Sequence, residues 1–126
     1  MTTIKPINTT KSPKAIGHYS QAIIVGNLIF TSGQISIEPE TGLMRDGSIE
    51  EQTERVIKNL KAILESAGSS LEKVVKVNVY LSDINDFDRM NKVYSEFFIS
   101  KPARATIQAG KLPRNAKIEM DVIAVI

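Results

Sequence analysis

Apolar and polar positions alternate along this chain in two ways, one typical of strands and one typical of helices. Short alternating or β-branched runs predict strands, and Gly26-Asn27 between two of these runs predicts a tight hairpin. The proline after Lys101 predicts an extended backbone at that lysine, just before another strand. The predicted strands cover residues 4–7, 19–25, 28–32, 74–81, 104–109 and 118–126.

Two stretches show helical spacing instead. The first begins at Ser48, which can cap the helix while Glu51 reaches back to it, and ends at Gly68. The second follows Asp83, a residue type that caps helices. Its buried side chains are predicted to be Phe87, Met90, Tyr94, Phe97 and Phe98. In the strand between these helices, the side chains predicted to face them are Val75, Val77, Val79 and Leu81.

This order of elements predicts an α+β fold, a single mixed β-sheet with two helices packed on one face. A chain of 126 residues is expected to form a single domain, residues 1–126. From Val122 to Ile126 both alternating sides of the last strand are apolar, which is unusual for a sheet with one face in water. We therefore expect an oligomer whose sheets pack together.

Charge and composition limit the classes of partner, metal site and cellular location that we expect for this protein. The net charge is +2, from 16 basic and 14 acidic residues with interleaved signs, so electrostatics alone gives no reason to expect nucleic acid or an anionic membrane as the partner. The absence of cysteine excludes disulfides and thiolate metal sites, and a single histidine cannot complete a zinc site. The first fifteen residues resemble no targeting signal, and no apolar run reaches membrane-spanning length, so we expect a cytoplasmic protein.

Few residues are candidates for chemistry. His18, the only imidazole, fits a loop histidine, and no nucleophile-elbow motif accompanies it. From the pattern alone, Arg104 is an edge charge and Glu119 lies on the solvated side of a strand. The alternative is that Arg104 binds a carboxylate through two parallel hydrogen bonds while Glu119 orients or deprotonates a water. Tyr19, Gly33 and Asn91 are either ordinary surface positions or the rim of a ligand site.

Several of these residues belong to motifs that resemble one family. Residues 102–107 (PARATI), 110–112 (GKL) and 118–120 (IEM) are similar to the signature segment of the RidA/YjgF (reactive intermediate deaminase) family. The front of the chain is similar too, with YSQA at residues 19–22 and GNLIFTSGQ at residues 26–34. The resemblance covers nearly the whole chain.

The resemblance implies a chorismate-mutase-like fold, a homotrimer with clefts between subunits, and no metal or cofactor. It implies hydrolytic deamination of 2-imino acids or their enamine tautomers, such as 2-iminobutanoate and 2-iminopropanoate, released by pyridoxal-phosphate dehydratases. By position, Arg104 holds the substrate carboxylate, Glu119 handles the water, and the cleft is lined by Tyr19, Gly33, Asn91 and the backbone of Thr106. Two departures stand out: His18 replaces a proline of many members, and Thr106 replaces a cysteine of some.

Two other functions remain open at this point. One is a non-catalytic small-ligand-binding or chaperone-like trimer, because membership of a family does not ensure turnover. The other is an endoribonuclease or translation inhibitor, with Lys111, Arg114 and Lys117 contacting phosphates, although a solvated basic turn accounts for them better.

The spacing of Arg104 and Glu119 sets a geometric condition on any shared site. If residues 104–125 form a simple hairpin, Glu119 lies opposite about Gln108, which is roughly 13 Å along the strand from Arg104. One small substrate cannot contact both at that separation. Either the two strands are not neighbours, or the site combines Arg104 of one subunit with Glu119 of the next.

Overall fold

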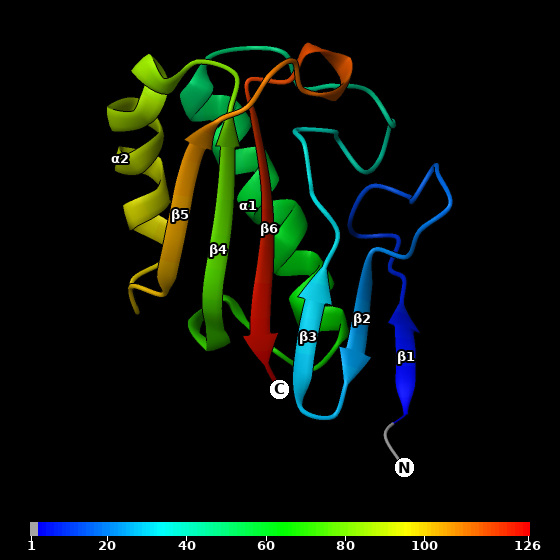
Figure 1. Cartoon of the computed structure of the whole chain (residues 1–126). Coiled ribbons are helices and arrows are strands. Elements are labelled where there is room, and N and C mark those ends of the chain that lie inside the picture. Colours follow the sequence, from blue (N-terminus) through cyan, green and yellow to red (C-terminus); the bar gives the residue numbers. More distant parts are fainter. Residues whose placement is uncertain (1–2) are drawn as a thin grey trace.

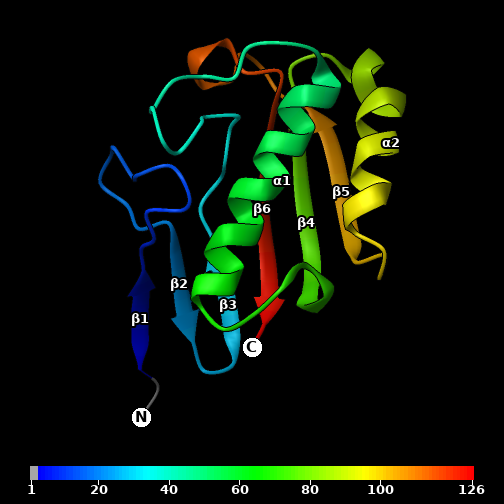
Figure 2. The same cartoon turned by 180° about the vertical axis from the view of Figure 1, so that it is seen from behind.

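The computed structural model describes residues 3–126 and contains one mixed sheet covered on one face by two helices (Figures 1 and 2). The strand order is β1-β2-β3-β6-β4-β5; β4 and β5 run parallel, and the other neighbours run antiparallel. The predicted α+β fold is therefore confirmed. Its strands are β1 (Ile4–Ile7), β2 (Ala22–Val25), β3 (Leu28–Thr31), β4 (Val74–Leu81), β5 (Ala103–Gln108) and β6 (Ile118–Val125). Its helices are α1 (Ile49–Ser66), α2 (Phe87–Phe97) and the 3₁₀ turns η1 (Leu71–Lys73), η2 (Ile84–Asp86) and η3 (Pro113–Asn115).

The local signals for the first hairpin and the first helix are confirmed. Val25 pairs with Leu28 across Gly26, whose φ of 60° suits the first central position of a tight hairpin turn. Ser48 and Glu51 form both halves of the capping box at the start of α1. The second helix differs by one turn, because Asp83 accepts from Asn85 N and caps η2 rather than α2.

The core lies between the sheet and the two helices. Alternate residues of β6 point into it, so Ile118, Met120, Val122 and Ala124 are buried while the residues between them are only half-buried. On β4, Val77, Val79 and Leu81 are buried as predicted, but Val75 is not. A register shift between Val74 and Lys76 inserts one extra residue, which turns Val74 inward and leaves Val75 exposed.

In the C-terminal third, the structure decides one open alternative and contradicts one prediction. Residues 104–125 do not form a simple hairpin, because β4 lies between β5 and β6 and pairs with both. The crossover through α2 brings β5 back parallel to the outer side of β4, and β6 takes the inner side (Figure 1). Lys101 is also not extended: its φ is 56°, in the left-handed region.

None of the helices within residues 3–126 is both long and apolar enough to span a membrane.

Candidate functional site

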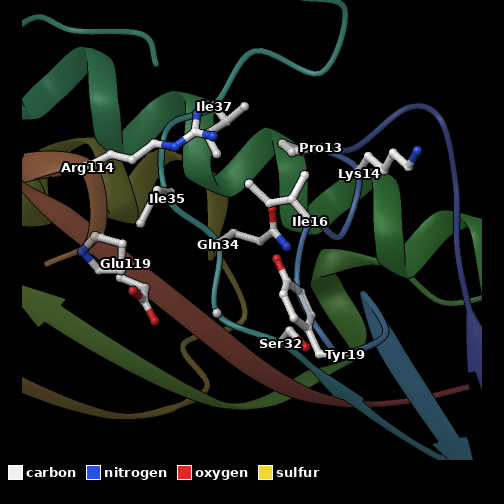
Figure 3. Close-up of a pocket in the computed structure, with 12 residues that line it drawn as sticks. Pro13, Lys14, Ile16, Tyr19, Ser32, Gln34, Ile35, Ile37, Arg114 and Glu119 are labelled. Atoms are coloured by element: carbon white, nitrogen blue, oxygen red, sulfur yellow. The ribbon is translucent and has the colours of Figure 1, made fainter. Parts of the chain in front are cut away.

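Glu119 lies in a depression of about 440 Å³ on the loop side of the sheet (Figure 3). We call this the glutamate depression. Figure 3 shows Glu119 and Arg114 on one side of it, with Tyr19 and Ile16 across from them. Its walls come from three loops and the start of β6: Pro13, Lys14, Ile16, Tyr19, Ser32, Gly33, Gln34, Ile35, Ile37, Pro113, Arg114 and Glu119.

The strand alternation of β6 decides where Glu119 points. Its neighbours Ile118 and Met120 are both fully buried beneath the helices, so the Glu119 side chain lies on the opposite, helix-free face of the sheet. Tyr80 is its cross-strand partner on β4, and Asp121 follows it on the same face. Asn78 Nδ2 donates to Asp121 Oδ1 at 2.9 Å, which fixes the second carboxylate.

Gly33 makes room for the Glu119 carboxylate. After Phe30 pairs with Ile123, β3 leaves the ladder and rejoins it where Gln34 pairs with Met120. Three residues of one segment thus face two of the other, which is the arrangement of a bulge. A Cβ on Gly33 would collide with Glu119 Oε2 and lie 3.0 Å from Glu119 Cδ. Glycine is therefore required here by close approach of the carboxylate, and its backbone needs no positive φ.

The pKa of Glu119 is raised from its ordinary value of 4.5, first by burial and second by the charge of Asp121. A carboxyl group shifted in this direction gives up and regains a proton closer to neutral pH. That property suits a group that exchanges protons with a water or an amine.

Tyr19 stands in a loop just before β2 rather than in the strand that the sequence predicts. Gln21 explains the difference, because its side chain accepts from Thr9 N and donates to Pro13 O, which ties this segment to the N-terminal loop. Ser32 then donates through Oγ to Ser20 O at 2.6 Å. These bonds hold the half-exposed Tyr19 at the rim of the glutamate depression, with its ring against Gly17.

Arg104 lies in a second depression of about 330 Å³ between β5 and α2, which we call the arginine depression. Its Nη1 donates to Asn91 Oδ1 at 2.6 Å, and its Cζ lies 4.7 Å from the centre of the Tyr94 ring and 5.3 Å from that of Phe87. The guanidinium therefore lies on the helix-covered face. The depression is lined by Asn91, Tyr94, Ser95, Phe98, Lys101, Pro102 and Arg104.

Thr106 lies two residues beyond Arg104 on the same edge strand, paired with Val79. Its side chain is half-buried, and Oγ1 has no hydrogen-bond partner within residues 3–126. Because β5 is the last strand of the sheet, one side of its backbone faces no other strand within residues 3–126. The Thr106 backbone is thus on an edge where a ligand or another chain can approach.

Within one chain, Arg104 and Glu119 are separated in both distance and direction. Glu119 pairs with Tyr80 and Tyr80 with Ile107, which is three residues beyond Arg104. Two strand spacings and three residue rises put the two Cα atoms roughly 14 Å apart. The side chains also lie on opposite faces of the sheet. Of the two alternatives that the sequence leaves open, the structure confirms that the strands are not neighbours.

The remaining predicted candidates lie in loops and turns: His18, Lys111, Arg114 and Lys117. His18 is exposed beside Gly17 and lines neither depression. In the basic turn, Arg114 Nη1 donates to Gly42 O at 3.1 Å and Lys117 Nζ donates to Gly47 O at 2.8 Å. These two cations therefore hold the loop before α1 in place. Within residues 3–126 no cluster of three His, Cys, Asp or Glu side chains could hold a metal ion.

A family model described as Endoribonuclease L-PSP matches residues 9–126. The chain belongs to the RidA/YjgF family. Among the relatives of this family, a RutC family protein of Pyrococcus abyssi is 61% identical over 119 residues, which cover 94% of both chains. The human 2-iminobutanoate/2-iminopropanoate deaminase is 42% identical over 120 residues, which cover 94% of this chain and 88% of the human protein.

One solved structure similar to this chain carries a small ligand. The crystal structure of E. coli TdcF with bound serine has a TM-score of 0.92 to this chain at 38% identity, and covers 97% of this chain and 98% of the other. The α+β fold found here is the fold of that family.

Sequence reasoning gave other roles to four residues that lie in or next to the two depressions. Tyr94 and Phe87 were assigned only to the core, although they share the stripe of α2 that carries Asn91. Lys101 and Arg114 have φ values of 56° and 54°, and each lines one depression. A left-handed backbone at a residue other than glycine often marks a functional site, but sequence alone does not reveal it.

Proposed function

We propose that this protein is a RidA-type deaminase that hydrolyses small 2-imino acids to 2-keto acids and ammonia. The observation that carries the proposal is the pair of depressions, one holding a guanidinium and the other a carboxyl group of raised pKa. An imino acid needs these two groups, one for its carboxylate and one for the attacking water. The serine bound to E. coli TdcF and the name of the human relative point to the same ligand class.

The reaction requires few protein groups. The iminium carbon is already electrophilic, so water adds to C2 while Glu119 takes one of its protons. Glu119 returns that proton to the amine of the resulting carbinolamine. The C–N bond then breaks, and the departing ammonia takes the proton of the C2 hydroxyl, which leaves the keto acid and an ammonium ion. Arg104 holds the carboxylate through two parallel hydrogen bonds and fixes C2 relative to the water.

We place each site between two subunits of a homotrimer, with Arg104 from one subunit and Glu119 from the next. The support is the roughly 14 Å separation within one chain, too long for one small substrate to span. The helix-free face also carries cross-strand apolar pairs, Phe30 with Ile123 and Leu28 with Val125. Phe30 is 40% exposed and Ile107, on the same face, is 54% exposed. A sheet face of this kind is suited to packing against another subunit.

As substrates we propose 2-iminobutanoate and 2-iminopropanoate, which dehydratases release from threonine and serine. The human relative is named for both compounds. Tyr19, Gly33, Asn91 and the Thr106 backbone line the proposed cleft, with Tyr19 and Gly33 on the glutamate side and Asn91 and Thr106 on the arginine side.

The test couples the protein to a threonine dehydratase acting on threonine and traps the remaining imine with semicarbazide. We expect the protein to lower the amount of trapped imine, and Arg104→Ala to lose this effect while folding normally. Equal trapping with and without the wild-type protein contradicts enzymatic turnover. In that case, calorimetric binding of 2-oxobutanoate separates a ligand-binding trimer from a protein with no affinity for this class.

A further inference from the structure

One stripe of α2 is organised around Arg104. Phe87, Asn91, Tyr94 and Phe98 follow one another at spacings of four, three and four residues, so they lie on the same side of the helix. This side faces β5, which runs next to α2 in both views of the fold (Figures 1 and 2). Three of the four residues are aromatic, although a cation is the group that they surround.

The rings and the amide constrain the guanidinium in different ways. The Arg104 Cζ lies 4.7 Å from the centre of the Tyr94 ring and 5.3 Å from that of Phe87, within the range of cation–π attraction. Asn91 accepts a hydrogen bond from Nη1 at 2.6 Å. Tyr94 is itself held, because its ring stacks on Phe98 at 4.5 Å between centroids and is only 6% exposed. The support for the guanidinium is therefore part of the packed core.

We propose that Tyr94 and Phe87 are positioning residues, which fix the plane of the Arg104 guanidinium before the substrate carboxylate binds. This inference rests on the proposed function, because it assigns the rings to the same carboxylate site. A free arginine side chain loses rotamer entropy when it binds a ligand, and a fork held in advance loses less. The rings thereby strengthen substrate binding without touching the substrate.

Substitutions at Tyr94 separate a role of its ring from a role of its hydroxyl group. The hydroxyl is buried and has no hydrogen-bond partner within residues 3–126. Removing an unpartnered buried hydroxyl costs little, whereas removing the ring removes the cation–π contact. Tyr94→Phe therefore keeps the proposed function of the residue, and Tyr94→Leu abolishes it. Phe87→Leu tests the second ring at a position that is only partly buried.

The experiment measures these three variants in two ways. The ¹⁵N relaxation of the Arg104 Nε in the ligand-free protein reports how rigidly the guanidinium is held. Imine hydrolysis then gives KM and kcat separately. We expect Tyr94→Leu to mobilise Nε and raise KM about tenfold, with kcat changed much less, because the ring acts on binding. Tyr94→Phe is expected to match the wild type in both measurements, and Phe87→Leu to show a smaller rise in KM.

Several results overturn the inference. A Tyr94→Phe variant as impaired as Tyr94→Leu assigns the effect to the hydroxyl, and an unchanged KM in folded Tyr94→Leu removes the ring from the site. If Tyr94→Leu does not fold, Phe87→Leu decides in the same way. Measuring the affinity for 2-oxobutanoate separates a failure of this inference from a failure of the proposed function. A wild type that binds this keto acid but hydrolyses no imine refutes deamination, and the loss of affinity in the leucine variants still supports positioning.

Discussion

The arginine depression and the glutamate depression are built in opposite ways. Arg104 is surrounded by partners within its own chain: an amide oxygen at 2.6 Å and two aromatic rings. Glu119 shares its side of the sheet with a second acid, and its pKa is raised mainly by burial and further by the charge of Asp121. The positive charge of Arg104 is thus stabilised and fixed, whereas the negative charge of Glu119 is destabilised by burial and by Asp121. The difference matches the proposed roles, since a carboxylate anchor must hold still and a proton carrier must change its charge.

The largest expected effect comes from changing the shape of the fixed cation. Arg104→Lys keeps the charge but loses the planar fork and the stacking on the rings. We expect a fall in kcat/KM of roughly a hundredfold, equivalent to the loss of about two charge-assisted hydrogen bonds, with the fold unchanged by circular dichroism. Arg89→Lys is the matched control, because Arg89 is an exposed arginine of α2 paired with Glu50. Near wild-type activity in Arg104→Lys would remove the fork from the mechanism.

A smaller loss is expected from displacing the glutamate. Gly33→Ala places a methyl group where the Glu119 carboxylate lies, so the side chain must move. We expect about a tenfold fall in kcat with a smaller change in KM, because misplacing a catalytic group by roughly 1 Å costs rate rather than affinity. Gly110→Ala serves as the control, since its Cβ meets nothing within 4 Å. Equal activity of the two variants contradicts the close contact between Gly33 and Glu119.

The smallest effect is on stability, and it tests whether folding destabilises the ionised form of Glu119. Burial raises the pKa of Glu119 above 4.5, so the folded state binds more protons than the unfolded state between these two values. This contribution to stability is fully present below pH 4.5 and is lost as the pH rises through the folded pKa. Glu119→Gln is therefore expected to melt above the wild type at neutral pH, with the difference disappearing at low pH.

Thermal unfolding at one fixed protein concentration measures this difference, since oligomers melt in a concentration-dependent way. Glu96→Gln, on the exposed side of α2, controls for the loss of one negative charge. A Glu119→Gln variant that is less stable than the wild type at neutral pH contradicts the claim that folding destabilises the ionised form of Glu119.

The local elements could be predicted from the sequence because each has its own signal. The capping box at Ser48, the hairpin at Gly26 and the alternation of β6 all depend on neighbours within a few residues. The order of the strands depends on long-range pairing instead. Nothing between residues 109 and 118 indicates that β6 pairs with β4 rather than with β5, so the sequence left open whether residues 104–125 form a hairpin.

The site residues show the same division. Family motifs pointed to Arg104 and Glu119, but only the sheet register shows that they lie on opposite faces. Tyr94 and Phe87 were predicted as buried side chains; Tyr94 is buried, and Phe87 is only partly buried against the core. Their contact with a cation could be seen only once β5 was placed beside α2. The left-handed backbone of Lys101 escaped prediction because the following proline favours an extended conformation.

The central claim is that one site is shared by two subunits, and subunit mixing tests it most directly. Arg104→Ala and Glu119→Gln are each expected to be inactive, and they are unfolded together at equal amounts and refolded. Random assembly leaves roughly a quarter of the sites with both groups intact, because each group comes from a different subunit. We predict the return of about a quarter of wild-type activity. If the two residues act within one chain, every site lacks one of them, and the mixture stays inactive.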